Sequence, residues 1–134
     1  MSKVVEKIKT IPKLYHASGC MMEQIDEAKD VLGLQFPEEF IDYVREYGAI
    51  SFFGTEWTGL NVTGYLNVVE TTKNERIADP GFPKDCFVLE NLGIDGLLAI
   101  VDEQGRVFSF WQGNQKAWCE SLSDYLDICL ARKK

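Results

Sequence analysis

Two glycines and a proline divide residues 21–53, and their positions constrain the fold more than any other feature of the chain. Gly33 and Gly48 each follow an apolar periodic segment, where a helix commonly ends in a left-handed residue. Pro37 fits the first helical position, because the N–H that proline lacks would have no helical partner there. The stretch therefore predicts two helices joined by a tight bend, followed by a short apolar strand at residues 49–53.

Apolar residues recur at helical spacing on both sides of the predicted bend. The first set is Met21, Ile25, Ala28 and Leu32, and the second is Phe36, Phe40, Tyr43, Val44 and Tyr47. Each set falls on one face of a helix, so both helices should bury that face. The acids of the second helix, at positions 38, 39, 42 and 46, share its polar face. A solvated face explains them, and an acidic docking surface is the alternative.

The rest of the chain predicts a mixture of helices and antiparallel strands. Residues 1–19 are either an N-terminal extension or a short amphipathic helix. Residues 65–79 have apolar side chains that could face the core from a helix, although their β-branched residues disfavour one, and they end at a Pro- and Gly-rich break. Strands are expected at residues 86–89, 96–101, 106–111 and 117–119, with a hairpin turn at 102–105 and a closing helix after Ser121. These elements predict an α+β fold over residues 1–134, a single domain whose antiparallel β-sheet of about four to six strands is flanked by helices.

The charge and the cysteines limit the classes of partner. A net charge of −7 disfavours nucleic-acid binding, because phosphates are neutralised by Lys and Arg. The same charge is compatible with a basic protein partner, or with solubility alone. Four cysteines, at positions 20, 86, 119 and 129, show neither a C-x-x-C pair nor metal-ligand spacing. Without an apolar secretory or membrane-spanning segment, the sequence predicts reduced thiols in a cytoplasmic protein that does not enter a membrane.

No combination of residues in the sequence indicates catalysis. His16 is the only histidine, and nothing near it supplies the third group that a Cys–His nucleophile needs. Asp102 and Glu103 form a neighbouring acid pair, but a predicted turn normally holds solvated acids. The glycines match neither G-x-G-x-x-G nor a phosphate-binding loop. We therefore expect no catalytic residues, no cofactor and no metal, and a protein that is not an enzyme.

The bend region resembles the opening of the SUKH superfamily. The resemblance is carried by an acidic helix ending in Leu-Gly, then x-x-Pro-x-x-Phe, then a second helix ending in Tyr-Gly before a strand. The matching residues are Leu32, Gly33, Phe36, Pro37, Phe40, Tyr43 and Gly48. The order of the predicted elements extends the resemblance over residues 20–131. This superfamily includes the fungal cell-wall-assembly regulators and many bacterial immunity proteins.

The resemblance implies an immunity protein, an antitoxin that binds a cognate secreted polymorphic toxin of basic, nuclease type and neutralises it stoichiometrically. It would act as a monomer or a weak homodimer. Candidate partner-binding residues are Glu56 and Trp57, in the predicted loop after the first strand, and Asp95, Glu103 and Trp111, in the turns and rim of the sheet. Trp57 could equally close the edge of the core, and the sequence does not show that these residues share a face. The alternative function is a non-catalytic protein-binding scaffold of the cell-wall-regulator type, and the third is an unrecognised enzyme.

Overall fold

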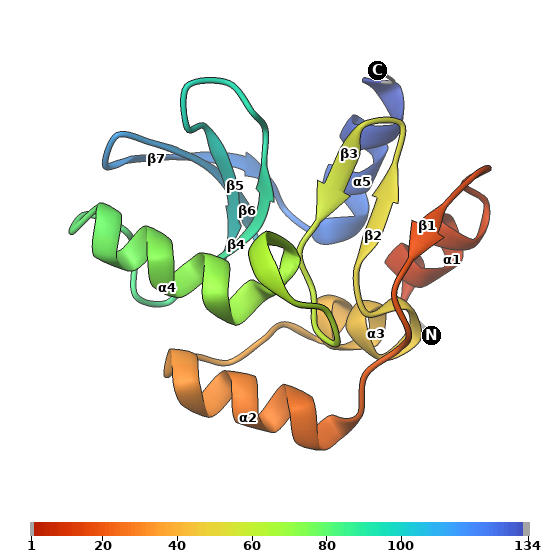
Figure 1. Cartoon of the computed structure of the whole chain (residues 1–134). Coiled ribbons are helices and arrows are strands. Elements are labelled where there is room, and N and C mark those ends of the chain that lie inside the picture. Colours follow the sequence, from red (N-terminus) through yellow and green to blue (C-terminus); the bar gives the residue numbers. More distant parts are fainter. Residues whose placement is uncertain (1, 133–134) are drawn as a thin grey trace.

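Helices surround two antiparallel sheets in the computed structural model, which describes residues 2–132 (Figure 1). The predicted α+β class is confirmed, although the strands are divided between two sheets. The elements of the described chain are α1 (Lys3–Lys9), β1 (Tyr15–His16), α2 (Met22–Leu32), α3 (Glu38–Tyr47), β2 (Ile50–Phe52), β3 (Thr55–Trp57), the 3-10 helix η1 (Gly64–Leu66), α4 (Val68–Ala78), β4 (Phe87–Asn91), β5 (Leu98–Val101), β6 (Val107–Trp111), β7 (Asn114–Cys119) and α5 (Leu122–Ala131).

The strand order is β1-β2-β3 in the smaller sheet and β4-β5-β6-β7 in the larger. Thr58, just beyond β3, links the two sheets. Its N–H donates to the Leu89 carbonyl at 2.8 Å, and its Oγ1 donates to the Val88 carbonyl at 2.7 Å. The smaller sheet is therefore attached to the free edge of β4, and β7 is the open edge on the other side.

The predicted bend between two helices is confirmed. α2 ends at Leu32, and Gly33 follows with a φ of 68°. Pro37 has an extended ψ of 154° and precedes the helix as its cap, so the prediction that it would be the first helical residue is wrong by one position. Gly48 ends α3 with a φ of 72°. A β-carbon on Gly48 would lie 2.3 Å from the Ser18 carbonyl oxygen, so close packing as well as conformation requires glycine there.

The N-terminal segment belongs to the main core. Val4, Val5 and Ile8 of α1 are buried and pack between α3 and α5. The described part of this segment thus contains one short helix, Lys3–Lys9. Tyr15 and His16 form the short strand β1 and pair with β2.

The larger sheet buries apolar residues on both faces. Leu89, Val101 and Val107 lie in the main core, together with α3 and α5. Val88 and Phe110 point the opposite way, into a smaller cluster that Phe82 helps to close. β5 is buried along its whole length.

The last strand is longer than predicted. Strands were expected at residues 106–111 and 117–119, but the turn between them is short, with positive φ at Gln112 and Gly113, at 47° and 79°. β7 begins directly afterwards, at Asn114, and pairs with β6. Within residues 2–132, no helix combines the length and apolar character that a membrane crossing needs.

Candidate functional site

Trp57 is a core residue and not a surface contact. The expectation that it could be exposed in a loop is wrong, because residues 55–57 form β3 and the Trp57 side chain is 0% exposed. Its ring packs edge-on against Tyr43 at 5.5 Å and parallel to Tyr125 at 6.1 Å between centroids. The period-two alternation of β3 explains the error, since it turns Trp57 inward and its neighbour Glu56 outward.

Asp95 and Trp111, by contrast, come together. The Trp111 indole N–H donates to the Asp95 carbonyl oxygen at 3.0 Å, which fixes a ring that is 43% exposed. Ile94, 62% exposed, lies beside them. These side chains border a surface depression, which we call the tryptophan hollow. Its lining residues are Ile94, Asp95, Leu97, Ser109, Trp111, Asn114 and Lys116.

Glu56 lies in a different opening, which we call the α4 cleft. The cleft lies between β3, η1 and α4 and the start of the larger sheet; its lining residues are Glu56, Thr58, Tyr65, Leu66, Thr71, Asn74, Glu75, Val88, Asn91 and Leu98. The Tyr65 hydroxyl donates to Glu56 Oε2 at 2.8 Å. Burial and the nearby Asp79 raise the pKa of Glu75 above its ordinary value.

The cleft and the hollow lie on opposite sides of the loop between β4 and β5. Leu98 lines the cleft and its neighbour Leu97 lines the hollow, and successive strand residues point to opposite faces. Asn91 enters the loop on the cleft side, while Asp95 occupies its tip with a φ of 50°. One partner could contact both openings only by enclosing this loop.

Glu103 is separated from both openings and has a structural contact. Its carboxylate accepts a hydrogen bond from the Gln35 backbone N–H at 2.7 Å, tying the β5–β6 turn to the bend before α3. That turn is at the opposite end of β5 from Asp95. The acid beside it, Asp102, is 2% exposed and pairs with Arg106 at 2.8 Å. The expectation of two solvated acids is therefore wrong for Asp102.

Two of the four acids on α3 also have structural partners. Glu39 accepts from the Leu122 N–H at 2.9 Å and so satisfies the start of α5. Asp42 accepts from the Ser2 hydroxyl. The acidic side chains of α3 therefore do not form a continuous docking surface.

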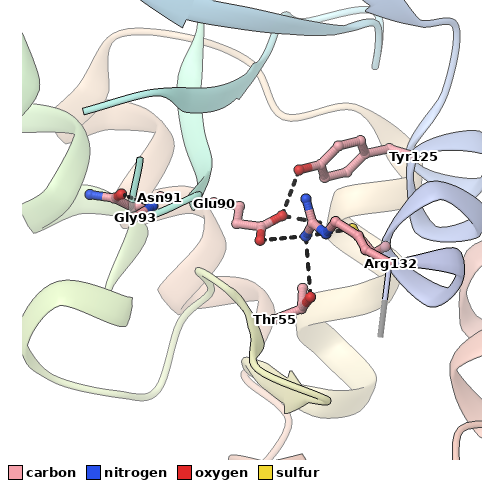
Figure 2. Close-up of polar contacts among 7 residues, drawn as sticks. Thr55, Glu90, Asn91, Gly93, Tyr125 and Arg132 are labelled. Atoms are coloured by element: carbon pink, nitrogen blue, oxygen red, sulfur yellow. Dashed lines mark hydrogen bonds and ion pairs between the residues drawn. The ribbon is translucent and has the colours of Figure 1, made fainter. Parts of the chain in front are cut away.

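A buried polar cluster, which no sequence pattern predicted, joins β3, β4 and α5 (Figure 2). The Glu90 carboxylate, 1% exposed, accepts from the Tyr125 hydroxyl at 2.5 Å and from the Arg132 guanidinium at 2.6 Å. Arg132 also donates to Thr55 Oγ1 at 3.2 Å. Burial first, and then Glu90, raises the pKa of the Cys129 thiol in this cluster to about 12. These contacts hold β3, β4 and α5 together, although the buried Nε of Arg132 has no hydrogen-bond partner among the described residues.

The remaining chemically reactive residues lie apart. His16 is exposed, and its ring lies 5.4 Å from that of Tyr47. Cys20, Cys86 and Cys129 are buried and Cys119 is half-buried, and all four are free thiols. Among residues 2–132, His, Cys, Asp and Glu side chains form no group of three or more that could hold a metal.

Together these features define a small α+β protein whose surface openings include an aromatic hollow and an acidic cleft beside one loop. A search of curated proteins finds no significant match. The family model described as SMI1-KNR4 cell-wall, SUKH_5, matches residues 1–131. The chain belongs to this family, and with it to the SUKH superfamily. The match begins at residue 1 and so includes α1, ahead of residue 20, where the sequence resemblance began.

Proposed function

We propose that this protein is an immunity protein that binds a cognate secreted toxin of basic, nuclease type and neutralises it without catalysis. Family membership supports a protein-binding role, because the superfamily includes toxin-immunity proteins. The observation that carries the proposal is the tryptophan hollow. A Trp111 ring that is 43% exposed, held by the Asp95 carbonyl and flanked by Ile94, is a preformed aromatic contact.

Aromatic side chains that are ordered before binding contribute most to protein interfaces, because little side-chain freedom is lost when the complex forms. Neighbouring polar side chains, Asn114 and Lys116 among them, would form the rim that excludes water from the aromatic centre. The net charge of −7 favours encounter with a basic partner. The protein would act in the cytoplasm by occupying its toxin.

The second candidate is a protein-binding scaffold of the cell-wall-regulator type, which the family description favours. In that role the same hollow would bind a protein of the producing cell, and no toxin would be involved. The two candidates share the surface and differ in the partner.

Co-expression with the toxin domain encoded beside the gene separates these functions. Cell survival together with a stoichiometric complex that co-purifies is the expected result. Survival without a complex would replace the binding proposal with modification chemistry. Cell death despite soluble expression of both proteins would favour the scaffold role. A catalytically inactive toxin variant serves as the control for expression, because it can be produced whether or not the protein protects the cell.

A further inference from the structure

We infer that the α4 cleft receives an arginine side chain of the basic partner. This inference rests on the proposed function. It specifies which chemical group of the partner would bind in the cleft, on that side of the β4–β5 loop. It follows from the size of the cleft, from its unneutralised carboxylates and from its apolar floor.

The size of the cleft suits one side chain. It encloses about 220 Å³, which is below the range of about 300–1,000 Å³ typical of small-molecule pockets. α4 forms one wall and is fixed in place, because Thr72 on its inner face accepts a hydrogen bond from the Val88 N–H at 3.1 Å. The cleft is therefore a rigid feature of the fold, present before a partner arrives.

The charge of the cleft is uncompensated. Glu56 and Glu75 both line it, and neither pairs with a cation in residues 2–132. Tyr65 occupies only Oε2 of Glu56, which leaves Oε1 to accept a further hydrogen bond. Partial burial and Asp79 raise the pKa of Glu75, so the charged form of this carboxylate is disfavoured until a cation approaches.

The remaining groups favour arginine over lysine. Asn74 adds an amide group to the lining, while the Asn91 Oδ1 already accepts from the Gly93 N–H at 2.8 Å. A planar guanidinium can donate to both carboxylates and to a further acceptor at once. Leu66, Val88 and Leu98 give the cleft an apolar surface against which the methylene groups of the incoming side chain can pack. A lysine ammonium is compact and strongly hydrated, and it would leave part of this acceptor set without a donor.

The test begins with the isolated protein, so that it does not depend on a toxin. The probe is N-acetyl-arginine methylamide, titrated into isotope-labelled protein and followed by NMR, with N-acetyl-lysine methylamide at the same ionic strength for comparison. The side-chain amide signals of Asn74 and Asn91 should move, and the pKa of Glu75 should fall when the arginine probe is bound. A merely structural role for Glu75 would leave its pKa unchanged by the probe.

The variant for this test is Glu56→Gln with Glu75→Gln, which should weaken probe binding at least about tenfold, because two charge-assisted hydrogen bonds lose their charge. The matched control is Glu23→Gln with Glu70→Gln, which removes the same charge from exposed positions outside the cleft and should leave binding unchanged. Equal binding of both probes, shifts located elsewhere, or equal weakening by the two variants would each overturn the inference. Binding to the toxin distinguishes a failure of this inference from a failure of the proposed function. A complex that forms equally well with the cleft variant overturns the inference and leaves the proposed function standing.

Discussion

Arg132 at the end of α5 donates to the carboxylate of Glu90 in β4 at 2.6 Å, and the carboxylate is almost completely removed from solvent. Tyr125, which precedes Arg132 by about two helical turns, donates to the other oxygen of the same carboxylate. The last helix is therefore attached to β4, an edge strand of the larger sheet, through one buried charge (Figure 2). Arg132 lies one residue beyond the end of the family match, which covers residues 1–131.

Removing Arg132 should destabilise the protein strongly. Arg132→Ala leaves Glu90 buried without its cation, and breaking a buried pair in this way typically costs about 3–5 kcal/mol. Urea denaturation followed by tryptophan fluorescence measures the loss. The control is Lys29→Ala, which removes a cation from an exposed helical pair with Asp26 and should cost no more than about 1 kcal/mol. Equal effects of the two substitutions would contradict a structural role for the buried pair.

Local chain signals predicted the helices well, because their ends are determined by residues close in sequence. Gly33 and Gly48 end α2 and α3 as expected, and the Ser121 hydroxyl accepts from the Asp124 N–H at the start of α5 as its capping pattern predicted. These features depend on backbone conformation and on hydrogen bonds within one helical turn. Such information is present in a single short stretch of sequence.

Features that join distant segments could not be predicted in the same way. Glu90 directly follows the strand expected at residues 86–89, and nothing local indicates that Arg132 will neutralise it from 42 positions away. The burial of Trp57 could not be predicted for a related reason, because a strand as short as β3 has too few residues to show an alternation of buried and exposed side chains. Asp95 and Trp111 were both selected, but only the antiparallel register of β5 and β6 brings them into contact.

Gly59 should not tolerate a side chain. A β-carbon at Gly59 would lie 1.6 Å from the carbonyl oxygen of Gly48, where the loop after β3 crosses the end of α3. The backbone would have to move apart, so Gly59→Ala should cost more than about 3 kcal/mol or prevent folding. Gly33→Ala is the matched control. It has open space around the new methyl group and should cost only about 1 kcal/mol for its left-handed conformation. Thermal unfolding of both variants tests the comparison.

The stability of the protein should fall in alkaline solution because of two buried thiols. Burial chiefly raises the pKa of Cys86 and of Cys129 from 9.0 to about 12. Between these pH values the unfolded chain releases protons that the folded chain keeps, so the stability present below pH 9 is lost as the pH rises. Each thiol should contribute a decrease of about 1.4 kcal/mol per pH unit in that window.

Urea denaturation at pH 8 and pH 10 measures this dependence. The control is the Cys86→Ala, Cys129→Ala variant, which is less stable at both pH values because of the cavities it creates. The difference between pH 8 and pH 10 should nevertheless be smaller for this variant than for the unsubstituted protein. The same pH dependence in both proteins would show that other groups cause the loss.

Trp57 and Trp111 provide a final comparison, because one tryptophan is buried and the other is exposed. Trp57→Ala removes a fully buried ring that packs on Tyr43 and Tyr125, and it should cost about 3–5 kcal/mol of stability. Trp111→Ala removes a ring that is 43% exposed and one hydrogen bond to Asp95, so it should cost less than about 2 kcal/mol.

Trp111 should matter more for partner binding than for stability. If the tryptophan hollow is the contact surface, Trp111→Ala weakens the complex at least about thirtyfold, as loss of a central aromatic contact does. Tyr15→Ala is the control, since Tyr15 is an aromatic residue 75% exposed on β1, in the other sheet. Calorimetric titration with an inactive toxin variant gives the affinity directly. If Trp111→Ala weakens the complex no more than Tyr15→Ala does, the hollow is not part of the interface, because the folded protein binds its partner without this ring.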